Sequence, residues 1–226
     1  MVEYTLNRSN RKTMGLYIRN GGVEVRAPLK TPGRDIDRFV ASKEAWIREK
    51  LEASAERRER RESFALSYGD SVLYRGTERP ITMRPGKHIG YDDELGCFYV
   101  PPGFDGEQIK YACARIYRML AKRDFTGRVV YFAKQMSVAP TAVKINAAKT
   151  RWGSCSARKS LNFSWRLAMA DDGVIDYVIV HELAHIIELN HSERFWAIVR
   201  DALPDFEARK ARLKALQKKL SFEDWG

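Results

Sequence analysis

Residues 174–196 read VIDYVIVHELAHIIELNHSERFW, and this stretch holds three of the four histidines in the chain: His181, His185 and His191. Its apolar residues recur at the spacing of a helix with one buried side. Positions four apart lie on one helical face about one turn apart, so His181 and His185 can present two imidazoles to one metal ion. The stretch therefore predicts a metal site carried by a helix.

Glu182 and a third ligand would complete a catalytic zinc site. Glu182 lies on the neighbouring flank of the helix, where its carboxylate can activate water without binding the metal itself. Catalytic zinc sites typically take three protein ligands and leave a fourth position open. We assign the third ligand to His191, because Asn190 before it tolerates the left-handed conformation that ends a helix. Glu188 is the competing ligand, and otherwise accepts a hydrogen bond from one of the ligand imidazoles.

The C-terminal half alternates helical and strand patterns around this stretch. We expect the metal helix to run from about Gly173 to Leu189, with Asp171 and Asp172 at the positive end of its dipole. The remaining expected elements are a helix over 107–135 with a potential break at Thr126-Gly127, strands over 142–148, 150–156 and 160–169, and helices over 192–202 and 205–220.

The N-terminal half contains mostly strand patterns. Residues 13–27 alternate apolar and polar side chains around Asn20-Gly21-Gly22, which predicts a β-hairpin. A single amphipathic helix is expected from Arg34 to about Glu62. Short strand-like runs separated by glycine and proline fill residues 64–100, and Pro101-Pro102-Gly103 is the expected boundary between the two halves.

Composition restricts the class of protein. The three cysteines are widely spaced and form no CxxC pair, which indicates a reducing compartment and argues against a disulfide framework. The N-terminus has no apolar segment typical of a secretory signal, and no apolar run approaches the ~20 residues of a membrane span. We therefore expect a cytoplasmic protein that does not enter membranes. The sequence leaves its oligomeric state open.

Positive charge is concentrated in one stretch. The chain has a net charge of +11, and residues 107–170 alone hold 13 Lys/Arg against two Asp/Glu. One interpretation is a solvated basic face, and the other is a field that draws an anionic substrate or nucleic acid toward the metal site.

The runs RWGSCS (151–156), LNFSWRL (161–167) and VIDYVIVHELAHIIELNHSERFW resemble the YgjP-like metallopeptidase family, distant relatives of the zincin and SprT-like proteins. RKTMGLYIRNGGVEVRAPL and ASKEAWIREKL in the N-terminal half extend the resemblance to most of the chain. The resemblance implies a zincin-like catalytic half in which His181, His185 and His191 match the metal ligands and Glu182 matches the catalytic base. It also implies either peptidase or nucleotide pyrophosphatase activity.

The expected fold is α+β in two parts. Residues 1–103 would form a β-rich region with one helix, and residues 104–226 a zincin-like catalytic region with a small sheet, a backing helix and the metal helix.

Three residues outside the metal group are candidates for substrate binding. Arg151 and Arg166 lie on strands next to the metal helix in sequence and could hold a carboxylate or phosphate. Tyr177, one turn before His181, could donate a hydrogen bond to a developing oxyanion, or simply belong to the core. The strand at 160–166 could also pair with a peptide as an edge strand.

Three functions are compatible with these residues. The favoured one is a metallopeptidase that binds one zinc, or another divalent metal, per chain and uses Glu182 to activate water. The alternative is a metal-dependent nucleotide pyrophosphatase that uses the same site, with the basic stretch holding phosphates. A nucleic-acid-binding module with a structural metal is less favoured.

Overall fold

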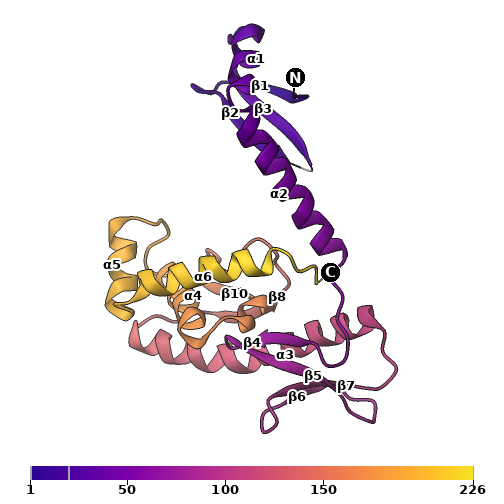
Figure 1. Cartoon of the computed structure of the whole chain (residues 1–226). Helices are drawn as coiled ribbons and strands as arrows, with labels where there is room; N and C mark the ends of the chain where they lie inside the picture. Colours follow the sequence, from indigo (N-terminus) through magenta and orange to yellow (C-terminus); the bar gives the residue numbers. More distant parts are fainter. Residues whose placement is uncertain (1, 20, 226) are drawn as a thin grey trace. The chain divides into compact units, whose positions relative to one another are not determined.

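The computed structural model describes residues 2–19 and 21–225, which form two compact units (Figure 1). The first unit comprises the chain up to Phe64 together with Ser221–Asp224, and the second comprises Ala65–Leu220 with Trp225. We expected a division at residues 103 and 104. Residues 65–103 instead lie in the second unit, because their strands pack against a long helix there.

A three-stranded sheet forms the base of the first unit. Strands β2 (Gly15–Arg19) and β3 (Gly22–Pro28) are antiparallel neighbours, which confirms the predicted hairpin; Asn20 of its turn lies outside the described residues. Strand β1 (Thr5–Ser9), which we did not predict, pairs in parallel with the other side of β3. The sheet order is therefore β1-β3-β2.

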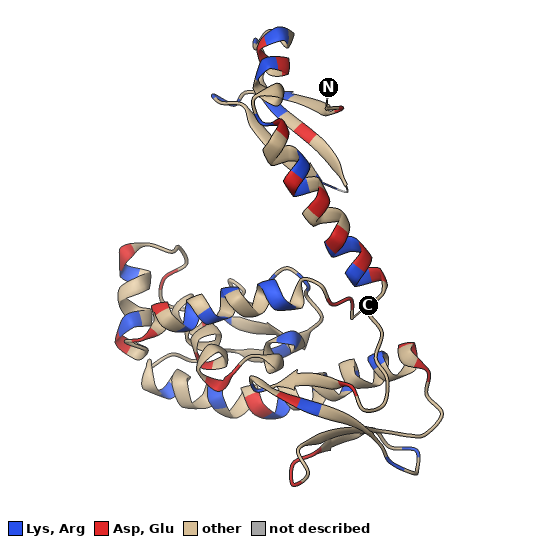
Figure 2. Cartoon of the chain, in the orientation of Figure 1, with Lys and Arg blue, Asp and Glu red and all other residues tan. Residues whose placement is uncertain are grey.

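Two helices cover this sheet where one was predicted. Helix α1 (Gly33–Ala41) and helix α2 (Glu44–Glu62) are separated at Ser42 and Lys43. The hydroxyl of Ser42 donates to the carbonyl of Phe39, and such local bonds compete with helix continuation. Charges of both signs alternate along α2 (Figure 2), as expected for a solvated helix. The core of the unit consists of buried Val23, Val25, Ala27, Ile36, Val40 and Ile47.

The second unit begins with a four-stranded sheet of order β4-β5-β7-β6. Its strands are β4 (Ser71–Tyr74), β5 (Thr77–Met83), β6 (Gly90–Asp92) and β7 (Cys97–Val100). The strand-like runs expected within 64–100 were FALSYG (64–69), VLYRG (72–76), RPITMRP (79–85) and CFYVPP (97–102); the first is wrong, and β6 lies outside all four. Residues 64–69 have no strand partner because Gly69 turns the chain at φ +90° and the phenol of Tyr68 donates to the carbonyl of Pro101.

Helix α3 (Gly106–Gln135) is the backing helix of the second unit. Its N-terminus is fixed by a capping box, in which the Asp105 carboxylate accepts from the backbone N–H of Gln108. The helix continues through Gly127 without a break, contrary to the expectation. Phe125 and Val129 on either side are buried, and this burial outweighs the low helix propensity of one glycine.

A second sheet lies beside the candidate metal helix. Strands β8 (Ala142–Asn146), β10 (Ser160–Ser164) and β9 (Gly153–Cys155) form it in that order, with β10 parallel to β8 and antiparallel to β9. The expectation that 160–166 is an edge strand is wrong: β10 is central and β9 lies at the edge. The strand also ends at Ser164, where the 3-10 helix η1 (Trp165–Met169) begins.

Three helices complete the second unit: α4 (Asp172–Ala184), α5 (Glu193–Ala202) and α6 (Phe206–Leu220). Helix α4 packs against α3, α5, α6 and β9. It ends at Ala184, five residues before the expected end at Leu189. The N–H groups of Ile186 and Ile187 donate to carbonyls three residues back, and these bonds form turns instead of continuing the helix. Among the described residues, no helix combines the length and the apolar character needed to cross a bilayer.

Candidate metal centre

Helix α4 carries the site residues, and an N-cap and ion pairs fix its N-terminal part. Asp171 caps its N-terminus by accepting from the backbone N–H of Val174. The first turns are also fixed by Arg128 of α3, whose guanidinium lies 2.7 Å from the carboxylate of Asp172 and 2.5 Å from that of Asp176. The side chains of Arg128 and Asp176 are only about a fifth exposed, so these ion pairs order the helix better than surface pairs would.

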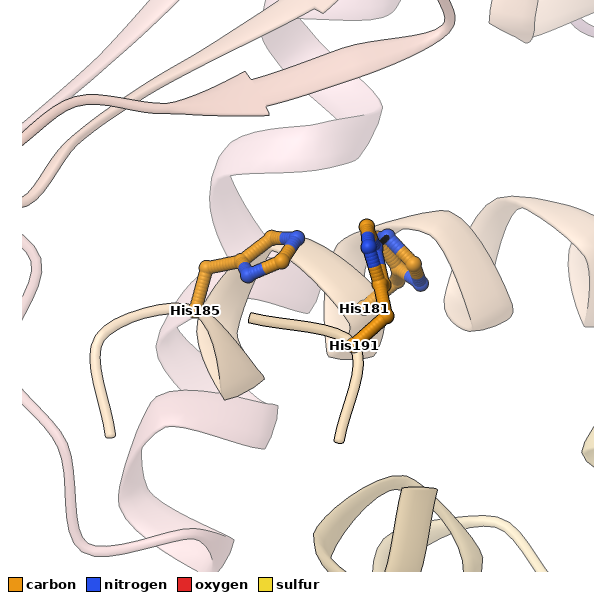
Figure 3. A group of neighbouring side chains, drawn as sticks. All are labelled: His181, His185 and His191. Carbon is orange, nitrogen blue, oxygen red and sulfur yellow. Dashed lines mark hydrogen bonds between the residues drawn. The ribbon is translucent and has the colours of Figure 1, made fainter. Parts of the chain in front are cut away.

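Three imidazoles converge at the C-terminal end of α4 (Figure 3). His181 lies in the last turn, His185 is the C-cap residue, and His191 comes from the loop that follows. One nitrogen from each ring lies within 4.8 Å of the other two, and the Nε2 atoms of His181 and His191 are 3.1 Å apart. Two nitrogens that bind one tetrahedral zinc at ~2.0–2.1 Å lie about 3.3 Å apart, so the spacing suits such an ion.

His191 reaches the group because α4 stops early and α5 starts immediately after it. The side chain of Ser192 caps α5 by accepting from the backbone N–H of Phe195, at 3.3 Å. His191 is the residue before this cap. Asn190 was expected to adopt the left-handed conformation, but the backbone has no positive φ there. The change of direction is made by the turns over residues 185–188 instead.

The His185 ring is oriented by the backbone of Glu188. Its Nδ1 atom lies 3.2 Å from the Glu188 carbonyl oxygen, so Nδ1 carries the proton and Nε2 keeps a free lone pair. From the sequence, the carboxylate of Glu188 was the competitor of His191 as third ligand, or an acceptor for one of the ligand imidazoles; its backbone carbonyl makes the contact with His185 instead. Within the described part of the chain, the group of potential metal ligands at this site contains the three histidines and not Glu188.

The donor set fits a divalent metal such as zinc. Burial, with smaller contributions from the charges of His185, His191 and Lys210, lowers the pKa of His181 to about 3. Burial also lowers the pKa of His185. Both rings are therefore neutral near pH 7, the form that binds metal. The Nδ1 atom of His181 is buried and makes no hydrogen bond to a described residue, and such orphaned atoms often mark a site completed by water or an ion.

Glu182 is a buried carboxylate beside the histidines. Its residue is 6% exposed and packs against β9 at Gly153. Burial raises the pKa of Glu182 to about 7, while the charge of Arg151 and a hydrogen bond from the backbone N–H of Cys155 oppose the increase. The carboxylate therefore has the basicity of a group that both accepts and returns a proton near neutral pH.

The three candidate substrate-binding residues lie in different surroundings. Arg151 is exposed, two residues before the start of β9, and close enough to lower the pKa of Glu182. The ring of Tyr177 is 5.9 Å from that of His181, and its residue is 5% exposed. Burial, followed by the charges of Glu207 and Glu182, raises the pKa of Tyr177 to about 12, so it stays protonated. Arg166 donates to the carbonyl of Ala147 and covers the ring of Trp165, contacts that support the sheet.

Two aromatic residues of α5 lie against the histidines, although their helical spacing in the sequence is typical of core residues. The ring of Phe195 lies 4.6–4.9 Å from each of the three imidazoles. Trp196 stacks on His191 at 5.7 Å. Phe195 is fully buried and Trp196 partly so. Their positions, four and five residues after His191, are a signal that could have indicated packing on the site.

The chain is similar to solved structures and matches a family model. The chain is similar to the metallopeptidase zymogen jannalysin of Methanocaldococcus jannaschii, with 25% identity, a TM-score of 0.37, and coverage of 42% of this chain and 97% of that one. It is also similar to the metallopeptidase zymogen abylysin of Pyrococcus abyssi, with 18% identity, a TM-score of 0.39, and coverage of 44% and 97%. No curated protein matches the chain. A family model described as YgjP-like, metallopeptidase domain, matches residues 12–216, and the chain therefore belongs to the YgjP-like metallopeptidase-domain family.

Proposed function

We propose that this protein is a zinc-dependent peptidase in which His181, His185 and His191 hold the metal and Glu182 is the catalytic base. The observation that carries the proposal is the convergence of three imidazoles beside a buried carboxylate. The H-E-x-x-H pattern favours zinc, and three imidazole nitrogens are a common zinc ligand set. Family membership supports peptide-bond hydrolysis as the reaction class.

The reaction needs a base, an acid and polarisation of the scissile carbonyl. Zinc bound by the histidines would supply Lewis acidity, which polarises the carbonyl and lowers the pKa of water. Glu182 accepts a proton from water at a carboxylate oxygen while the water oxygen bonds to the carbonyl carbon. The same carboxylic acid then returns the proton to the leaving amine nitrogen as the C–N bond breaks. A carboxyl with a pKa near 7 suits both transfers.

Strand β9 is the element best placed to bind a peptide. It lies at the edge of its sheet and next to Glu182. An extended peptide can add to such an edge through backbone hydrogen bonds. We assign Arg151, two residues before β9, to a carboxylate of the substrate. We assign the Tyr177 hydroxyl to the oxyanion that develops during hydrolysis.

Replacing Glu182 by Gln tests the proposal, because Gln keeps the size of the side chain and removes its basicity. Purified wild type should contain about one zinc per chain and cleave members of a peptide library. We expect Glu182→Gln to retain zinc and lose peptidase activity by about a hundredfold or more. Glu188→Gln is the matched control, since Glu188 is a nearby carboxylate outside the histidine group, and it should keep most activity.

The same preparations should be assayed with the common nucleoside triphosphates. Full turnover by metal-replete Glu182→Gln would contradict the role of Glu182 as the base. Nucleotide hydrolysis that collapses in Glu182→Gln, without peptide cleavage by the wild type, would contradict the peptidase assignment and favour the pyrophosphatase.

A further inference from the structure

Lys210 of α6 is a cation beside the metal centre to which no role has been given. Its ammonium nitrogen lies 4.5 Å from the ring centroid of Trp196, the residue that stacks on His191. The ring of Trp196 also lies 5.9 Å from that of His181. These contacts place a positive charge on the aromatic ring that adjoins two of the proposed metal ligands.

The ion pair of Lys210 is weak enough for a ligand carboxylate to replace it. Its ion-pair partner is Glu207 at 3.6 Å, and the two side chains are 46% and 70% exposed. An exposed pair of this kind contributes little free energy and exchanges readily with a competing carboxylate. The long lysine side chain also adapts its reach more easily than a buried group does.

A second cation borders the centre from another element. Arg151 is exposed and lies two residues before Gly153, at the start of β9. Gly153 itself contacts Glu182. The site is therefore flanked by one cation from the end of β9 and one from α6, both on the second unit. Figure 2 shows that α6 carries mainly positive charge.

The chain segment that carries Arg151 contains no acidic residue of its own. Residues 125–170 include the whole of the sheet next to Glu182, and this segment has no Asp or Glu. Its eight basic residues are Arg128, Lys134, Lys144, Lys149, Arg151, Arg158, Lys159 and Arg166. Asp172 and Asp176 of α4 neutralise the charge of Arg128. Arg128 therefore stabilises that helix and does not add positive electrostatic potential at the site.

We propose that the enzyme selects peptides with acidic side chains near the scissile bond, and that Lys210 is a specificity-determining residue that binds one of these carboxylates. The inference rests on the proposed peptidase function and adds the chemical class of its substrate. A lysine that only packs on Trp196 would contribute to folding without distinguishing between peptides.

A charge-reversal experiment separates these two roles of Lys210. The substrates are peptides of one sequence that is cleaved by the wild type, with Glu, Gln or Lys placed in turn at each position flanking the cleaved bond. The proteins are zinc-loaded wild type, Lys210→Glu, and Lys210→Met, which keeps the length of the side chain on Trp196. Lys214→Glu is the matched control, because Lys214 is exposed one helical turn farther along α6.

We expect the wild type to favour Glu over Lys by roughly tenfold in kcat/KM at one or more positions, with a preference that shrinks as salt is added. Lys210→Met should lose most of the preference at one position, and Lys210→Glu should reverse it there. Lys214→Glu should keep the wild-type preference to within about twofold. Zinc content and the thermal midpoint, measured for every variant, show whether the fold and the centre persist.

The results that would contradict the role of Lys210 differ from those that would contradict the peptidase proposal. Peptide cleavage that ignores charge, or an equal effect of Lys214→Glu and Lys210→Glu, overturns the inference and leaves the peptidase proposal intact. A wild type that contains zinc and cleaves no peptide overturns both. If Lys210→Glu loses zinc or unfolds, the Lys210→Met comparison decides: an unchanged preference in that variant overturns the role of Lys210.

Discussion

Gly153 and Glu182 fit together without room for one additional carbon atom. A Cβ atom at position 153 would lie 2.6 Å from both Cγ and Oε1 of Glu182. Contacts that short do not occur between real side chains, so the missing side chain of Gly153 is what allows Glu182 to lie against β9. The backbone N–H of Cys155, two residues later, then donates to the same carboxylate. One short strand thus positions the proposed base.

Gly153→Ala should therefore impair catalysis without removing the metal. The obstructing atoms belong to Glu182 and not to the histidines, so we expect zinc content to be unchanged and kcat to fall by about tenfold or more as the carboxylate is displaced. Gly127→Ala is the control, since no atom lies within 4 Å of a Cβ at that helical position. This change should leave kcat alone and stabilise the fold by about 0.5–1 kcal/mol. Equal kcat in Gly153→Ala and the wild type would show that Glu182 does not depend on this contact.

The ligand assignment predicts a graded response of zinc content to substitution. His181→Ala and His185→Ala should each lose near-stoichiometric zinc, because each removes one of the two ligands on the helix. His191→Ala should weaken zinc binding as well, while Glu188→Ala should not, since its role toward His185 is carried by the backbone carbonyl. Metal analysis after dialysis against a weak chelator makes the comparison. Loss of zinc from Glu188→Ala but not from His191→Ala would show that the third ligand has been misassigned.

Local signals in the sequence were sufficient for much of the second unit. The Asp171 cap and the apolar spacing after it predicted where α4 begins, and the histidine spacing predicted which side chains lie together at its other end. The α+β class and the family are likewise confirmed. These predictions succeed because capping and helical periodicity depend on residues only a few positions apart.

The features that were missed depend on contacts between distant parts of the chain. Strand β1 pairs with β3 about twenty residues later, and its side chains are exposed, so no buried alternation marks it as a strand. The central position of β10 follows from a parallel pairing with β8 that its own sequence does not encode. The contact between Gly153 and Glu182 also joins distant parts of the chain. A glycine in a short strand indicates that another group approaches the backbone closely, but the local sequence does not predict which group this is.

Tyr177 provides the last test, because its position is compatible with either a core or a catalytic role. Its residue is 5% exposed and its ring lies 5.9 Å from that of His181, yet its hydroxyl makes no hydrogen bond to a described residue. The hydroxyl is not among the buried atoms without a partner, so it is accessible, and an oxyanion formed at the scissile carbonyl would accept its hydrogen bond during the reaction. We expect Tyr177→Phe to keep zinc and to lower kcat about tenfold or more with little change in KM, since the bond forms only in the transition state. Stopped assays at saturating peptide measure kcat, and thermal unfolding of the same sample measures stability. Unchanged kcat in a stable, zinc-loaded variant would assign Tyr177 to the core, and the oxyanion would then need another donor.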